Sequence, residues 1–121
     1  MHALTVLLAE QDSSVASSLA TSLDEQRHSV QVVRSLHELR SEIARQHVQV
    51  VVVDLETVGL ADVASLRRDF HVPIICTHRI PDDGLWTAAM EAGAADVCER
   101  SNIAGLVRAL RFARSNISTA A

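Results

Sequence analysis

The sequence Val50-Val51-Val52-Val53-Asp54 decides the fold class of this chain. Four consecutive β-branched apolar residues are typical of a strand that is buried on both faces, as in a parallel sheet covered by helices. Asp54 directly follows this run and is expected at the carboxyl end of the strand, the edge at which open α/β sheets bind ligands. This position makes Asp54 a candidate metal ligand, a candidate nucleophile, or both.

The rest of the chain alternates between segments of strand length and segments with helical spacing. The expected strands lie at residues 4–9, 30–33, 48–53, 73–76 and 95–98. Helices are expected between and after them, with candidate capping residues at Asp12 or Ser13, Ser35, Asp82 or Asp83, and Ser101 or Asn102. This alternation predicts a flavodoxin-like (βα)5 three-layer sandwich with a parallel five-stranded sheet of order 2-1-3-4-5. We expect a single domain over residues 1–121, with a frayed tail from about Ser115.

Composition narrows the class of protein. Hydrophobic residues make up 48% of the chain and charged residues 21%, which favours a packed core over disorder. The net charge of −4 argues against direct binding to nucleic acid. The N-terminus lacks the pattern of a secretory signal, and no apolar run approaches the roughly 20 residues needed to cross a bilayer. We therefore expect a cytoplasmic protein with no membrane segment.

The two cysteines, Cys76 and Cys98, fit neither a disulfide framework nor a zinc-binding pattern. They lie on neighbouring expected strands, and adjacent strands are about 5 Å apart. We therefore expect the two thiols to face each other, either as buried reduced thiols or as a redox pair.

Acidic residues are expected to converge at one edge of the sheet. In the strand order 2-1-3-4-5, the switch point lies between the first and third strands. The first expected strand is followed by Glu10-Gln11-Asp12, and the third by Asp54. Asp12 is interpreted as a helix N-cap rather than as a ligand. Glu10 and Asp54 are expected to line one acidic pocket, with Arg100 reaching towards it.

Several motifs stand in the same register as those of a known family. Residues 6–12 combine an apolar strand with an acidic cluster, Asp54-Leu55-Glu56 follows the third strand, Gly59 lies in the next loop, and residues 93–96 read Gly-Ala-Ala-Asp. Together they resemble the receiver domain of two-component response regulators. The shared register runs from about Thr5 to Arg114.

The resemblance implies a phosphoacceptor and a metal site. Asp54 would accept a phosphoryl group from a sensor histidine kinase. The chain would be a phosphoacceptor rather than an enzyme, and would at most catalyse its own phosphorylation and dephosphorylation. Mg²⁺ would be held by Glu10, Gln11, Asp54 and the backbone carbonyl of Glu56. Because Gln11 is neutral where the family carries an acid, we expect the Mg²⁺ to bind weakly.

The resemblance also implies contacts to the phosphoryl group, at positions where this chain departs from the family. The family's lysine corresponds to Arg100. The chain contains eleven arginines and no lysine. At the end of the fourth strand the family carries a switch residue with a hydroxyl group. Its position corresponds to either His78 or Thr77, and ungapped spacing favours His78. Val97 takes the place of the family's switch aromatic.

These departures leave two functions open. The first is a phosphorylated receiver. The second is a pseudo-receiver, a protein-interaction module that works without phosphorylation. Flavin or nucleotide binding on the same fold is disfavoured, because no Gly-rich phosphate loop follows the first strand and aromatic residues make up only 2% of the chain.

A candidate partner surface lies towards the end of the chain. Arg108, Arg111 and Arg114 recur at intervals of three on the last expected helix, and Trp86 lies on the helix before it. Aromatic and arginine side chains are enriched in protein interfaces. The resemblance implies a homodimer through the last helices and strand, whereas the alternative interpretation is an ordinary solvated helix face.

Overall fold

The structure is a computed structural model that describes residues 3–120, with side chains described up to Ala113. Five parallel strands form one sheet in the order β2-β1-β3-β4-β5. The strands are β1 (Thr5–Ala9), β2 (Ser29–Val33), β3 (Val50–Asp54), β4 (Ile74–His78) and β5 (Asp96–Glu99). The flavodoxin-like fold and the strand order expected from the sequence are confirmed.

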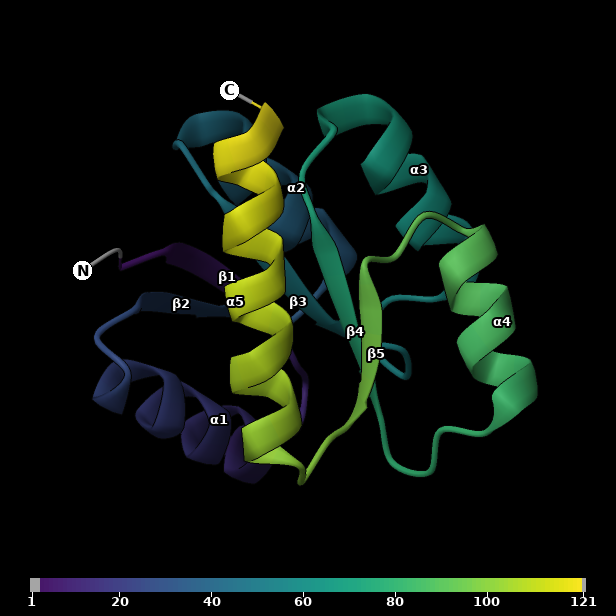
Figure 1. The fold of residues 1–121 in the computed structure, drawn as a ribbon, viewed down its shortest axis with the longest axis horizontal. Coiled ribbons are helices and arrows are strands. Elements are labelled where there is room, and N and C mark those ends of the chain that lie inside the picture. Colours follow the sequence, from purple (N-terminus) through teal and green to yellow (C-terminus); the bar gives the residue numbers. More distant parts are fainter. Residues whose placement is uncertain (1–2, 121) are drawn as a thin grey trace.

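Helices cover both faces of the sheet, as Figure 1 shows for α5 on the near side. They are α1 (Ser13–Glu25), α2 (Leu36–Arg45), α3 (Leu60–Phe70), α4 (Asp83–Glu91) and α5 (Ile103–Ala120). One core cluster joins the sheet to α1 and α5, and the other joins it to α2, α3 and α4. All five residues of β3 are buried, because this central strand is covered on both faces.

Local sequence signals determine where the helices begin and end. The side chain of Asp12 accepts hydrogen bonds from the backbone N–H groups of the first turn of α1, and Ser35 and Asp82 do the same for α2 and α4. Asn102 accepts from the backbone N–H of Gly105 at 3.0 Å. Gly93, just after α4, has a φ of 105°, a conformation that side-chain-bearing residues rarely adopt.

α5 extends to Ala120, and no Gly or Pro follows Gly105 to interrupt the helix; fraying of its end from about Ser115 stays a prediction. One expectation differs from the structure. The thiols of Cys76 and Cys98 do not face each other: the register places Cys98 opposite Thr77, and the two thiols belong to the core clusters on opposite faces of the sheet. The expectation was wrong because a shift of one residue along a strand moves a side chain to the other face.

Candidate functional site

Three segments meet at the carboxyl edge of the sheet, at the end of the molecule where β5 leads into α5 (lower part of Figure 1). Glu10 directly follows β1, Asp54 is the last residue of β3, and Arg100 directly follows β5. β1 and β3 are neighbours in the sheet, with Ala9 paired with Val53. The structure thus brings together the three charged residues that the sequence placed in one pocket.

Asp54 is fully buried and hydrogen-bonded at both carboxylate oxygens. Arg100 donates to Oδ1 from Nη2 at 2.7 Å and from Nε at 3.2 Å, and the Thr77 hydroxyl donates to the same oxygen at 3.2 Å. Oδ2 accepts the backbone N–H of Glu56 at 3.1 Å. A buried carboxylate is tolerated in this way because its charge is both paired and hydrogen-bonded.

Glu10 is also buried, with 1% of its surface exposed, but it is less well satisfied. Its Oε2 accepts the backbone N–H of Asp12 at 3.0 Å. Its Oε1 is, among the side chains that the structure describes, the one buried polar atom without a hydrogen-bond partner, and Arg100 Nε lies 3.7 Å away. Burial, and to a smaller extent the negative charge of Asp54, raise the pKa of Glu10 despite the bond from Asp12 and the attraction of Arg100.

Arg100 lies close to all three acids of the pocket. Its side chain is only 14% exposed, and Nη2 lies 3.6 Å from Glu56 Oε1 in addition to its contacts with Asp54 and Glu10. Burial by itself would lower the pKa of Arg100, but the hydrogen bond and the attraction of the three carboxylates raise it. The guanidinium is therefore a fixed positive charge among three acids.

Comparisons with known proteins agree with this fold. No protein-family model and no curated protein matches the sequence. Solved structures do match: a two-component response regulator from Clostridium difficile has a TM-score of 0.84 at 16% identity, over 94% of this chain and 98% of that one. The chain has the receiver-domain fold.

Two further receiver structures show the same likeness. The BeF3-activated N-terminal receiver domain of RstA from Klebsiella pneumoniae has a TM-score of 0.82 at 23% identity, over 89% of this chain and 96% of that one. The beryllofluoride-activated NtrC4 receiver domain dimer has a TM-score of 0.76 at 20% identity, over 92% of this chain and 93% of that one.

Within this receiver fold, Thr77 and His78 have different surroundings. Thr77 is 1% exposed and pairs with Asp54 across neighbouring strands, so its hydroxyl reaches the carboxylate. His78 is half-buried, and its Nδ1 accepts the backbone N–H of Ile80 at 3.1 Å. Ungapped spacing favoured His78, but the register between β3 and β4 brings Thr77 to the pocket.

The residues expected to hold Mg²⁺ do not form a metal site in this arrangement. Gln11 is exposed, and only its backbone N–H, which donates to Thr57 Oγ1 at 3.1 Å, has a described contact in this region. Asp54 Oδ1 is occupied by Arg100, and the part of the chain with described side chains holds no cluster of three His, Cys, Asp or Glu residues able to bind a metal. Mg²⁺ requires about six oxygen ligands in near-octahedral geometry, and here a guanidinium lies among the donors.

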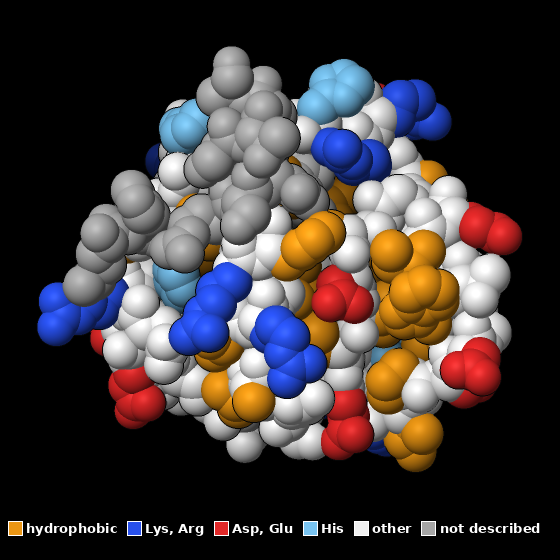
Figure 2. Space-filling view, in the orientation of Figure 1, with side chains coloured by type: hydrophobic (Ala, Val, Ile, Leu, Met, Phe, Trp, Pro, Cys, Tyr) orange, Lys and Arg blue, Asp and Glu red, His pale blue; other side chains and the backbone are white. Residues whose placement is uncertain are grey.

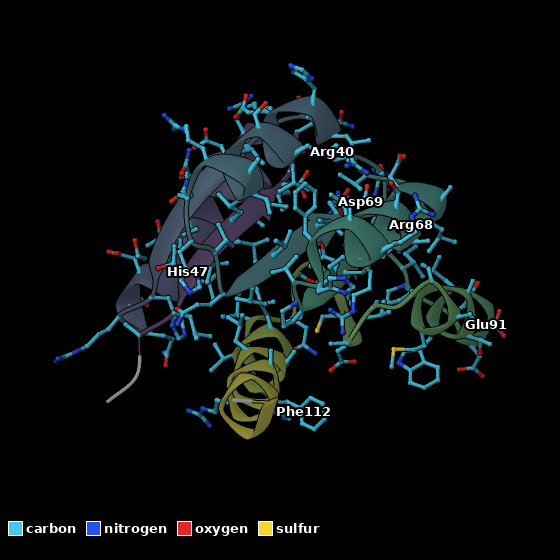
Figure 3. The ribbon with its side chains drawn as sticks, turned by 90° about the horizontal axis from the view of Figure 1, so that it is seen from above. Arg40, His47, Arg68, Asp69, Glu91 and Phe112 are labelled. Atoms are coloured by element: carbon cyan, nitrogen blue, oxygen red, sulfur yellow. The ribbon has the colours of Figure 1, made fainter. Side chains whose placement is uncertain are left out.

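The expected partner surface divides into two parts. Trp86 and Arg108 line a shallow hollow together with Phe112, and Trp86 and Phe112 are 47% and 57% exposed. Figure 2 shows apolar side chains over α4 and α5 with basic ones beside them, and Figure 3 shows Phe112 projecting from α5. Arg111 instead lines a neighbouring hollow with Arg108 and Gln26, and the side chain of Arg114 lies outside the described residues.

Phe112 was not singled out from the sequence. It follows Arg108 by four positions on α5, and residues four apart on a helix share a face. Two features of the sequence could have identified Phe112. They are this spacing and the fact that Phe112 is one of the few aromatic residues in the chain. No helix within residues 3–120 is both long and apolar enough to cross a membrane.

Proposed function

We propose that this chain is a receiver that accepts a phosphoryl group on Asp54 from a sensor histidine kinase in the cytoplasm. One observation carries the proposal: a buried carboxylate at the carboxyl edge of the sheet has a guanidinium and a hydroxyl hydrogen-bonded to the same oxygen. In the transfer, an Asp54 oxygen forms a bond to phosphorus as the phosphorus–nitrogen bond to the kinase histidine breaks. The histidine nitrogen retains the electron pair of that bond.

Arg100 and Thr77 would each have a role in this reaction. Phosphoryl transfer depends mainly on positioning and on stabilising negative charge. Arg100 supplies a positive charge beside Asp54, and its forked guanidinium can donate two hydrogen bonds to phosphoryl oxygens. The Thr77 hydroxyl can donate a third. Since Arg100 is already paired with Asp54, this ion pair must rearrange during transfer, and we expect the reaction to be slow.

The second candidate function is a phosphorylation-independent interaction module. A specific observation favours it: Arg100 contacts Asp54, Glu10 and Glu56 together, so the charge that would receive a phosphoryl group is already compensated. The neutral, exposed Gln11 points the same way. In this function the fold would serve only to present a partner surface.

A homodimer is part of both candidates. The candidate interface lies on α4 and α5. It combines two exposed aromatic side chains, Trp86 on α4 and Phe112 on α5, with the positive charge of Arg108, as protein interfaces do. The NtrC4 structure, which is described as a receiver domain dimer, supports dimer formation by a protein of the same fold.

The deciding experiment is incubation with a small-molecule phosphodonor, with and without MgCl2, read by intact mass. The parent is expected to gain one phosphoryl group, and Asp54→Asn to gain none. Arg79→Gln removes an arginine whose described ion pair is with Glu56, at 3.0 Å, and is expected to react as the parent does.

The double variant Gln11→Asp with Arg100→Lys restores the family's residue types at two of the positions where this chain departs from them. It should react faster than either single variant, because both changes act on one phosphoryl group. If neither the parent nor the double variant is ever phosphorylated, the interaction module replaces the phosphoacceptor.

A further inference from the structure

We propose that Arg100 is the resident cation of the acidic pocket, and that its guanidinium excludes a divalent ion which Glu10 and Asp54 would otherwise bind. The inference concerns the charge balance of the pocket, so it holds whether or not Asp54 is phosphorylated. In this view Arg100 supplies the positive charge that a metal ion would otherwise supply. The divalent-cation site is latent and becomes available only when Arg100 is removed.

The contacts of Arg100 carry the first step. Its Nη2 lies 2.7 Å from Asp54 Oδ1 and 3.6 Å from Glu56 Oε1, while Nε lies 3.7 Å from Glu10 Oε1. One side chain thus reaches acids at the carboxyl ends of the neighbouring strands β1 and β3, and Glu56 in the loop after β3. At 14% exposure the guanidinium lies largely out of solvent, where attraction between charges is weakly screened.

Glu10 carries the second step. Its Oε1 is buried and accepts no hydrogen bond, and the distance of 3.7 Å to Arg100 Nε is too long for one. An unsatisfied buried carboxylate oxygen costs free energy that a correctly placed cation would recover. Arg100 satisfies Asp54 well and Glu10 poorly, so Glu10 keeps an unused coordination position directed into the pocket.

Competition between Arg100 and a metal carries the third step. A divalent ion between Glu10 and Asp54 would have to displace the Nη2 contact of 2.7 Å and would place two positive charges beside a guanidinium. Gln11 contributes no charge to offset that repulsion. Removal of Arg100 leaves two buried, uncompensated carboxylates, the oxygen donors that Mg²⁺ prefers.

The test is thermal unfolding of the full chain in MgCl2, with NaCl at matched ionic strength as the reference. The parent is expected to change its melting temperature by less than about 1 °C, whereas Arg100→Gln should gain about 5 °C at saturating Mg²⁺, the shift expected when an ion binds only the folded state. Arg79→Gln is the matched control, because Arg79 contacts Glu56 from an exposed position and has no described contact with Asp54 or Glu10. It should respond as the parent does.

A second variant locates the ion. Asp54→Asn in the Arg100→Gln background should lose the Mg²⁺ response. Direct Mn²⁺ binding, followed by electron paramagnetic resonance, should be strongest for Arg100→Gln and weaker for both the parent and the double variant. If Arg100→Gln does not fold without metal, refolding it with and without MgCl2 tests the same point, and Arg100→Lys, which keeps the charge but not the fork, should show a smaller Mg²⁺ response.

Two results would overturn the inference. One is a parent that binds Mg²⁺ as tightly as Arg100→Gln does. The other is an Arg100→Gln variant that shows no Mg²⁺ response in either unfolding or refolding. Neither result depends on a phosphodonor, so failure of the inference is distinguishable from failure of the proposed phosphorylation.

Discussion

Two parts of the same strand, Val50–Val53 and Asp54, are equally buried and are stabilised in different ways. The four valines gain free energy simply by leaving water, about 25 cal/mol per Å² of apolar surface, in a way that does not depend on direction. Asp54 loses its hydration on burial. The free energy lost in this way must be offset by directed contacts with Arg100, Thr77 and the backbone of Glu56.

The difference shows where this chain can vary and where it cannot. An apolar core position accepts other apolar residues of similar volume. Asp54 depends on side chains from β4 and from the segment after β5, and Arg100 is 46 residues away in the sequence. The core is therefore sensitive to volume, and the pocket is sensitive to the identity of a few partners.

The largest expected effect is in the core. Leu8 on β1 is fully buried and pairs with Val52. Leu8→Ala should lower the free energy of unfolding by about 3 kcal/mol, because it leaves a cavity, whereas Leu8→Met should cost less than about 1.5 kcal/mol. Urea denaturation measures both. A loss below about 1 kcal/mol for Leu8→Ala would show that the sheet can close around the missing volume.

The next effect is in the pocket. Arg100→Gln should lower the free energy of unfolding by about 2 kcal/mol in the absence of divalent ions, because it leaves Asp54 buried and unpaired. In a double-mutant cycle with Asp54→Asn, we expect a coupling of at least about 1 kcal/mol.

The exposed pair Arg79 and Glu56 gives the matched control for that cycle. Its two side chains are 65% and 37% exposed, so Arg79→Gln and Glu56→Gln should couple by less than about 0.5 kcal/mol. Equal coupling in the two cycles would contradict the distinction between a buried and an exposed ion pair.

The smallest effect is the pH dependence that Glu10 contributes. Because burial raises its pKa in the folded state above the ordinary value of 4.5, the folded state binds this proton more tightly than the unfolded state does. The stability contribution of Glu10 is therefore present at low pH and is lost as the pH rises from 4.5 through the raised pKa. Glu10→Gln does not titrate, so its stability relative to the parent should increase across that window.

Urea denaturation at pH 4 and pH 7.5, each with parent and Glu10→Gln, measures this difference. A relative stability that falls between the two pH values would mean that Arg100 satisfies Glu10 better than the contact distances indicate. Glu42→Gln, on α2 and away from the pocket, is a control with the opposite sign: Arg45 and Gln31 lower the pKa of Glu42, so that substitution should cost more at pH 7.5 than at pH 4.

The sequence by itself determined the sheet, its strand order and the starts of α1, α2 and α4. The strand order follows from the alternation of strands and helices. The rest follows from local patterns: the run Val50–Val53 predicts a strand buried on both faces, and Asp12, Ser35 and Asp82 each satisfy backbone donors within their own first turn. The meeting of Glu10 and Asp54 at one edge was also predictable, because parallel strands share a carboxyl edge.

Only the tertiary structure decided which side chains touch. Thr77 rather than His78 reaches Asp54, and Cys76 and Cys98 point to opposite faces, because the direction of each side chain depends on strand register and changes with a shift of one residue. That Arg100 contacts three acids at once depends on the packing of segments far apart in the chain, which no local pattern records.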